Sequence, residues 1–139
     1  MKELIFTSLE IQVLEWLLAG DDSVLNVLRH QLHSSSIESR QYTGVGFYLK
    51  FDVPHISQGF LEPHKVKPSF CFGDVDVELT TDNYQQRVGF LLWVEDGYLD
   101  QLEAYTYGDE KWPEKIDEFN LRYLGNHRDL DDLRRNWEL

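Results

Sequence analysis

The stretch Val88–Tyr107, VGFLLWVEDGYLDQLEAYTY, decides the fold because it predicts a β-hairpin with Asp96-Gly97 at its tip. A two-residue type I′ turn needs positive φ at both central positions, and Asp-Gly adopts this conformation at low cost. Apolar runs flank the turn on both sides, as they do in hairpins. In strict register from this turn, both faces of the hairpin carry apolar side chains. We therefore expect a central hairpin that is covered at least partly on each side.

Glu103 is the exception in this hairpin. In strict register it lies opposite Phe90, on the face that the apolar pattern assigns to the core. One interpretation is a β-bulge in the second strand, because one extra residue moves every later side chain to the other face. The other is a partly buried carboxylate with Arg40 or Arg87 as its partner, which would mark a functional site. The sequence leaves both interpretations open.

The remaining pattern predicts an α+β protein, with an N-terminal helical hairpin packed on a mainly antiparallel sheet. Thr7 and Glu10 form a capping-box pattern before a first apolar stripe, which should end at Gly20. Asp21-Asp22-Ser23 offers caps for a second helix. The short loop between the two stripes predicts an antiparallel pair of helices.

Alternating apolar residues predict further strands. One runs over 45–53, and another over 70–79 with a bulge at Gly73-Asp74, where the alternation changes phase. Residues 37–43 look extended, and the alternation of Phe119, Leu121 and Tyr123 predicts a return of the chain to the sheet. Helical spacing in the last residues predicts a short C-terminal helix within 129–137. We expect one domain, with the helical hairpin in residues 1–36, the antiparallel sheet in 37–124 and the tail in 125–139.

Length and composition indicate a folded globular chain. The chain has 139 residues, of which 42% are hydrophobic and 14% aromatic. The single cysteine, Cys71, excludes an intramolecular disulfide and fits the reducing cytoplasm. No segment approaches the roughly 20 apolar residues that span a bilayer, and the N-terminus lacks the apolar core of a signal peptide. We therefore expect a cytoplasmic protein without a membrane partner.

The net charge is −12, which makes nucleic acid a poor partner because phosphate binding needs clustered Lys and Arg. Residues 95–118 hold nine acids and two lysines, a net charge of −7. This region is either a solvated surface that keeps the protein in solution or a docking face for a basic protein. The candidate binding residues combine acids with aromatic side chains: Asp96, Asp100, Tyr105, Tyr107, Asp109, Glu110, Trp112 and Glu114.

No motif for catalysis, a metal or a cofactor is evident. The chain has no G-x-S-x-G elbow, P-loop or H-E-x-x-H pattern. His30 and His33 lie one helical turn apart, but no nearby carboxylate or cysteine completes a metal site. The only catalytic candidate is Glu103, with Arg40 and Tyr105 beside it. We therefore expect no metal and no cofactor.

Three segments together resemble a family of small, uncharacterised bacterial proteins. They are T-G-V-G-F at 43–47, F-G-D-V at 72–75 and G-F-L-L-W-V-E-D-G-Y-L-D-Q-L-E-A-Y-T-Y-G-D-E-K-W-P at 89–113. The resemblance covers roughly residues 7–123 and implies a helical hairpin joined to these sheet segments. It also implies a bacterial origin, and it assigns no catalytic residue.

Acidity, small size and the absence of catalytic motifs favour a non-catalytic protein-binding module. Its most concrete form is an immunity-type inhibitor that covers the cationic cleft of a basic toxin. Two alternatives remain, an enzyme that uses a buried Glu103 and a subunit of a larger assembly.

Overall fold

The computed structural model describes residues 4–55, 61–62, 64–108 and 110–139. Its elements confirm the α+β class. The helices are α1 (Ser8–Leu17), α2 (Ser23–Ser34) and α3 (Leu130–Arg134). The strands are β1 (Ser36–Tyr42), β2 (Gly46–Asp52), β3 (Phe70–Phe72), β4 (Val75–Thr81), β5 (Tyr84–Glu95), β6 (Tyr98–Thr106) and β7 (Glu118–Tyr123).

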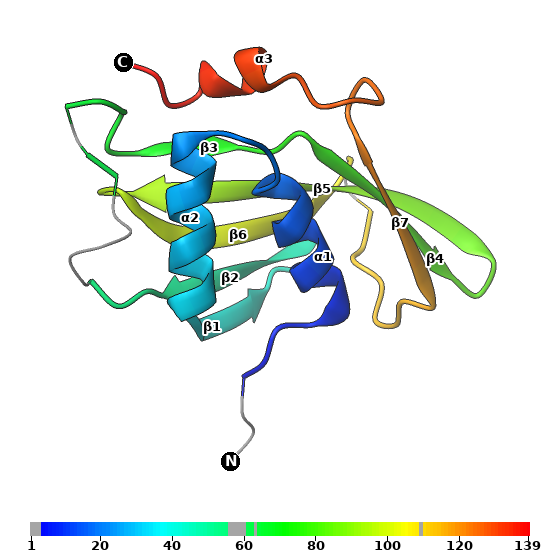
Figure 1. Cartoon of the computed structure of the whole chain (residues 1–139). Helices are drawn as coiled ribbons and strands as arrows, with labels where there is room; N and C mark the ends of the chain where they lie inside the picture. Colours follow the sequence, from blue (N-terminus) through cyan, green and yellow to red (C-terminus); the bar gives the residue numbers. More distant parts are fainter. Residues whose placement is uncertain (1–3, 56–60, 63, 109) are drawn as a thin grey trace.

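The strands form one antiparallel sheet in the order β1-β2-β6-β5-β4-β7, and β3 pairs with the last part of β5. Helices α1 and α2 lie on the same face of this sheet, and α3 lies beside β3 at its edge (Figure 1). The expected hairpin of β5 and β6 is therefore central. It lies between β2 and β4.

The predicted helix caps are present. Thr7 and Glu10 exchange hydrogen bonds between side chain and backbone, so α1 begins with a complete capping box. The Asp22 carboxylate accepts the backbone N–H groups of Val24 and Leu25 and so caps α2. Helix α1 ends at Leu17, earlier than the Gly20 stop that the pattern predicts. Gly20 has φ 126° and belongs to the turn between the helices.

The central hairpin has the predicted turn, with φ of 51° at Asp96 and 84° at Gly97. The strict pairing register that the sequence predicts for this hairpin is wrong. Val94 pairs with Leu99 but Trp93 pairs with Gln101, so Asp100 is an extra residue in β6. The bulge moves Glu103 opposite Leu91, away from Phe90 and the helices. Of the two interpretations of Glu103, the bulge is therefore correct.

The second predicted bulge is also present. Phe72 pairs with Leu92 and Asp76 with Gly89, so the β3–β4 segment carries one residue more than β5 over this distance. A Cβ atom at Gly73 would lie 2.0 Å from the Phe90 carbonyl oxygen. Only glycine allows the backbones to approach this closely.

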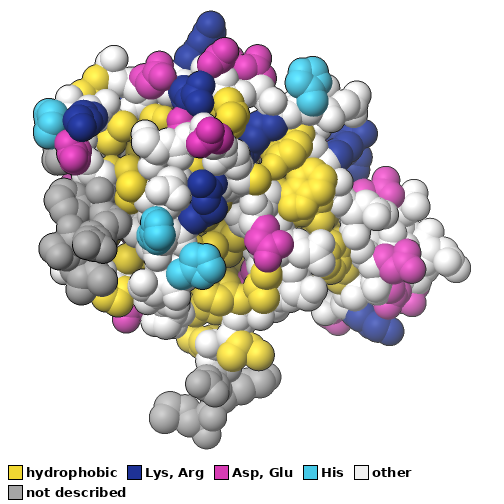
Figure 2. All heavy atoms as spheres, in the orientation of Figure 1, with side chains coloured by type: hydrophobic (Ala, Val, Ile, Leu, Met, Phe, Trp, Pro, Cys, Tyr) yellow, Lys and Arg dark blue, Asp and Glu magenta, His cyan; other side chains and the backbone are white. Residues whose placement is uncertain are grey.

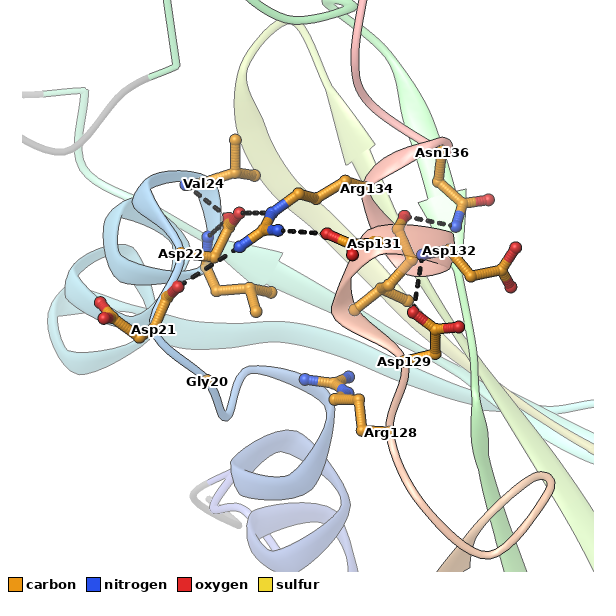
Figure 3. Close-up of polar contacts among 12 residues, drawn as sticks. Gly20, Asp21, Asp22, Val24, Arg128, Asp129, Asp131, Asp132, Arg134 and Asn136 are labelled. Atoms are coloured by element: carbon orange, nitrogen blue, oxygen red, sulfur yellow. Dashed lines mark hydrogen bonds and ion pairs between the residues drawn. The ribbon is translucent and has the colours of Figure 1, made fainter.

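The C-terminal segment is attached to the helical layer by arginines. Arg134 donates to the Asp22 carboxylate at 2.7 Å and to Asp131 at 2.9 Å, so α3 is joined to the N-terminus of α2 (Figure 3). Arg128 donates to Asp74 at 2.9 Å and to the Leu17 carbonyl oxygen at 2.6 Å. The predicted helix in 129–137 is shorter than expected, because only Leu130–Arg134 is α-helical.

The core lies between the sheet and the two N-terminal helices. Side chains on this face of the strands are buried, among them Leu49, Val77, Phe90, Leu92 and Leu102. None of the described helices lies on the second face of the sheet (Figure 1). The side chains of Leu91, Trp93 and Tyr105 on this face are half-buried, so the hairpin is covered there only in part. Among the described residues, no helix is both long and apolar enough to cross a membrane.

Candidate functional site

The second face of the sheet, here called the open face, carries the side chains that alternate with the core residues of β2, β6, β5, β4 and β7. Strand pairing places these side chains in rows across the sheet. They are Tyr48, Lys50, Gln101, Glu103, Tyr105, Leu91, Trp93, Arg87, Asp76, Glu78 and Arg122. Tyr107 follows directly after β6, where its hydroxyl reaches Asp76.

Asp76 forms the first polar centre of the open face. Its side chain is only 2% exposed, and its Oδ2 atom accepts hydrogen bonds from Arg87 at 2.6 Å and from Arg122 at 2.9 Å. The Tyr107 hydroxyl donates to Oδ1 at 2.7 Å. Three strand segments thus contribute to one carboxylate, and both of its oxygens have partners.

Electrostatics at this centre favours a charged Asp76 and a neutral Tyr107. Burial alone raises the pKa of Asp76, but the hydrogen bonds from Tyr107, Arg87 and Arg122 outweigh it and lower the pKa below the usual value. Burial and the hydrogen bond to Asp76 raise the pKa of Tyr107 strongly. Asp76 therefore acts as a cross-strand link, and its carboxylate has no free oxygen for a ligand.

Tyr105 covers a glycine in the neighbouring strand. Gly89 lies opposite Tyr105, and a Cβ atom at this glycine would lie 2.5 Å from the Cζ atom of the tyrosine ring. The ring therefore fills the space that a side chain at position 89 would occupy. Burial, followed by the negative charges of Glu103 and Asp76, raises the pKa of Tyr105, so the phenol remains neutral at physiological pH.

Glu103 forms the second polar centre. In the sheet it lies between Tyr48 on β2 and Leu91 on β5. The indole nitrogen of Trp93 donates to its Oε1 atom at 3.1 Å. Among the described residues, no lysine, arginine or histidine lies within ion-pair distance of Glu103.

The proposed partners of Glu103 are engaged elsewhere. Arg40 pairs with Leu49 in register and therefore points to the helical side, where it donates to Glu10 at 2.7 Å and 2.9 Å. Arg87 binds Asp76. The catalytic constellation of Glu103 with Arg40 is not assembled, because the two side chains lie on opposite faces of the sheet.

The predicted binding residues fall into three places. Asp96 and Asp100 lie at the hairpin tip, in the turn and the bulge. Tyr105 and Tyr107 lie on the open face. Three more lie in the segment between β6 and β7: Glu110, Trp112 and Glu114. The nine residues of β6 separate the tip from this segment by about 30 Å, and Asp109 lies outside the described residues.

Trp112 is a packing residue on the helical side. Its ring centroid lies 5.4 Å from that of Phe47 and 6.4 Å from that of Phe90, edge to face in both cases. Its backbone N–H donates to the Gly44 carbonyl oxygen at 2.9 Å. The prediction that Trp112 joins Tyr105 and Tyr107 in one surface therefore does not match the structure.

Acidic side chains gather at the hairpin tip. Burial raises the pKa of Asp100, Lys50 lowers it, and the charges of Glu95 and Glu38 raise it further, so the net direction is upward. Lys50 itself lies 3.6 Å from Glu38. These acids repel one another, and a cationic partner would relieve that repulsion.

The hollows on the helical side of the described residues include two that border α1. One, of about 680 Å³, is bordered by the start of α1, Tyr42, Trp112 and Glu114. The other, of about 980 Å³, lies between α1 and α2, where Figure 2 shows hydrophobic side chains at the surface. In the part of the chain that the structure describes, no buried side-chain polar atom lacks a hydrogen-bond partner.

His30 and His33 both lie on α2. Over the described residues, no group of three or more His, Cys, Asp or Glu side chains is placed to hold a metal ion. Comparison with models of protein families, with curated proteins and with solved structures found no match. The resemblance to small bacterial proteins stays a prediction.

Sequence reasoning missed most of the open face. Tyr48, Asp76, Trp93 and Arg122 were not among the candidates, and Arg87 was considered only as a partner of Glu103. The alternation in 45–53 and 75–79 does place Tyr48 and Asp76 on the side away from the core. The strand order that brings them together is not visible in the sequence, because it depends on pairing between distant segments.

Proposed function

We propose that this protein is a non-catalytic, cytoplasmic module that binds a basic protein through the open face of its sheet. An immunity-type inhibitor of a basic toxin is the most concrete form of this proposal. The observation that carries it is an uncovered sheet face with aromatic and aliphatic side chains, where Tyr48 is 37% and Tyr107 41% exposed. The proposal includes neither a nucleic acid nor a membrane partner.

The chemistry of the open face supports a protein partner. Tyrosine, tryptophan and arginine are enriched in protein interfaces and often dominate their energetics. Trp93, Leu91 and Tyr105 are half-buried there, so a partner would remove their remaining surface from water. The rigid strands hold these side chains in place, which lowers the conformational entropy that binding costs.

The size of the open face also suits an interface. Five neighbouring strands span about 20 Å, and β6 is about 30 Å long, so the face covers roughly 600 Å² in projection. A typical specific interface buries about 800 Å² on each partner. The acidic tip and the segment between β6 and β7 extend beyond this area and could contact the rim of a basic partner.

The net charge of −12 supports a basic partner because opposite charges accelerate encounter and reject acidic proteins. If charge governs encounter, Asp96→Lys and Glu110→Lys should each slow association with the captured partner, and more strongly at low salt than at high salt. Unchanged association rates in both variants would contradict the proposal.

The first test uses the tagged full-length protein to capture partners from its host at low and high salt, followed by mass spectrometry. Two matched tyrosine variants identify the surface used. Tyr48→Ala changes the open face, whereas Tyr42→Ala changes a tyrosine that packs beside Phe47 on the helical side. We expect one basic protein that is lost at high salt, weakened by Tyr48→Ala and retained by Tyr42→Ala. Capture that is insensitive to Tyr48→Ala would refute the open face as the binding surface.

A further inference from the structure

We propose that Glu103, surrounded by the rings of Tyr48, Trp93 and Tyr105, is a recognition site for an arginine side chain of the partner protein. This inference rests on the proposed function and names the chemical group that the open face selects. A guanidinium group would form an ion pair with the carboxylate and stack against the aromatic rings.

The sheet register places these groups around one point. Tyr48 is directly opposite Glu103 on β2, and Tyr105 is two residues along β6 on the same face. Trp93 lies on the next strand and holds the carboxylate through its indole N–H at 3.1 Å. No hydrogen bond within the described residues engages the second carboxylate oxygen, so that oxygen is open to a ligand.

Glu103 differs from the other shielded acids among the described residues in its lack of a cationic partner. Four other carboxylates that the fold shields from water each have an arginine partner: Glu10, Asp22, Asp74 and Asp76. Two half-buried acids without an ion pair still lie beside a cation, since Glu78 faces Arg87 and Asp100 lies near Lys50. Glu103 has neither.

Lys50 is the nearest basic residue in register, because it pairs with Gln101 next to Glu103. Its amino group lies 3.6 Å from Glu38, so it is directed toward the edge of the sheet. The charge of Glu103 also acts on its neighbours, since after burial it is a cause of the raised pKa of Tyr105 and of Cys71.

The chemistry of the site favours arginine over lysine or a quaternary ammonium. The aromatic rings beside Glu103 suit a planar guanidinium, which stacks on ring faces. A guanidinium is also more weakly hydrated than an ammonium, so it loses less on leaving water. Quaternary ammonium groups are instead bound by enclosing aromatic cages.

The test is a titration of the isotopically labelled full-length protein with N-acetyl-arginine amide, followed by the Trp93 indole N–H resonance. A Trp93→Phe variant assigns that resonance among the four tryptophans. We expect a saturable shift with the arginine probe, a weaker one with N-acetyl-lysine amide, and none with sodium chloride at equal ionic strength.

Glu103→Gln is the decisive variant, because its amide oxygen can still accept the Trp93 hydrogen bond while the charge is removed. It should weaken the arginine probe about tenfold or more, as expected for a lost ion pair of this kind. Glu78→Gln, which removes another acid of the open face, is the matched control and should bind as the unmodified protein does.

An absent shift, an equal shift with sodium chloride or an equal affinity in Glu103→Gln would each overturn the inference. The two proposals fail separately. The titration detects the arginine site without any partner, and the capture experiment detects a partner without the probe.

Discussion

Replacing Arg40 with methionine tests whether this arginine serves Glu10 or Glu103. Arg40 donates two hydrogen bonds to Glu10, at 2.9 Å and 2.7 Å, and the two side chains are 12% and 2% exposed. Methionine preserves much of the apolar stem but leaves a buried carboxylate without its cation. Breaking a buried pair in this way costs about 3 kcal/mol. For a chain of this size the melting temperature should fall by about 10 °C.

A double-mutant cycle assigns the partner. Glu10→Gln added to Arg40→Met should destabilise less than the sum of the single changes, with a coupling energy of about 2 kcal/mol, because the buried charge is removed together with its partner. The cycle of Arg40→Met with Glu103→Gln should show additivity within about 0.5 kcal/mol, since the side chains lie on opposite faces. Urea unfolding at neutral pH, followed by circular dichroism, measures all the variants.

The result that would refute this reasoning is strong coupling of Arg40 to Glu103 together with additivity for Glu10. That outcome would also restore the catalytic constellation that the structure separates. Equal m-values across the series would show that the changes act on stability and not on the compactness of the unfolded chain.

Three further predictions follow from the sheet and the helix caps. The pKa of Asp76 is lowered in the folded protein, so its charged form stabilises the fold above the unfolded pKa of about 3.9, and this stabilisation is lost as the pH falls through the folded pKa. The difference in unfolding free energy between the unmodified protein and Asp76→Asn should therefore be largest at neutral pH and should shrink toward zero in acid, as measured by urea unfolding at a series of pH values. Gly89→Ala should destabilise by about 1–3 kcal/mol through the clash with Tyr105, and Tyr105→Ala in the same chain should recover part of that loss in urea unfolding. Asp22→Ala should lower the free energy of unfolding by about 2 kcal/mol, because it removes both the helix cap and the Arg134 ion pair. Asp22→Ser should lower it less, because serine can still cap α2. Equal melting temperatures for the two variants would contradict the capping role.

Local signals predicted much of the fold. The Asp96-Gly97 turn, the Thr7–Glu10 capping box and the bulge at Gly73-Asp74 each involve residues near one another in the chain. Their physical causes, a positive φ, a pair of reciprocal hydrogen bonds and a close backbone approach, can be inferred from residue type and spacing. The helical pair and the strands followed from periodicity for the same reason.

The candidate site could be predicted only in part. Tyr105 and Tyr107 were predicted to contact a partner, and both lie on the open face. The acids of residues 95–118 were treated as one surface, but they occupy different ends of the sheet because a strand extends about 3.3 Å for every residue. Charge counted along the sequence does not show how an extended strand distributes that charge in space.

The sequence by itself determined the turns, the caps and the alternation of buried and exposed side chains, because these depend on the conformations of neighbouring residues. Only the tertiary structure decided which carboxylates have a cation. Asp76 meets Arg87 and Arg122 because β5 and β7 both pair with β4, and Glu103 faces away from Arg40 because one extra residue at Asp100 reverses its side. Both outcomes depend on strand pairing between distant segments, which composition and local periodicity do not specify.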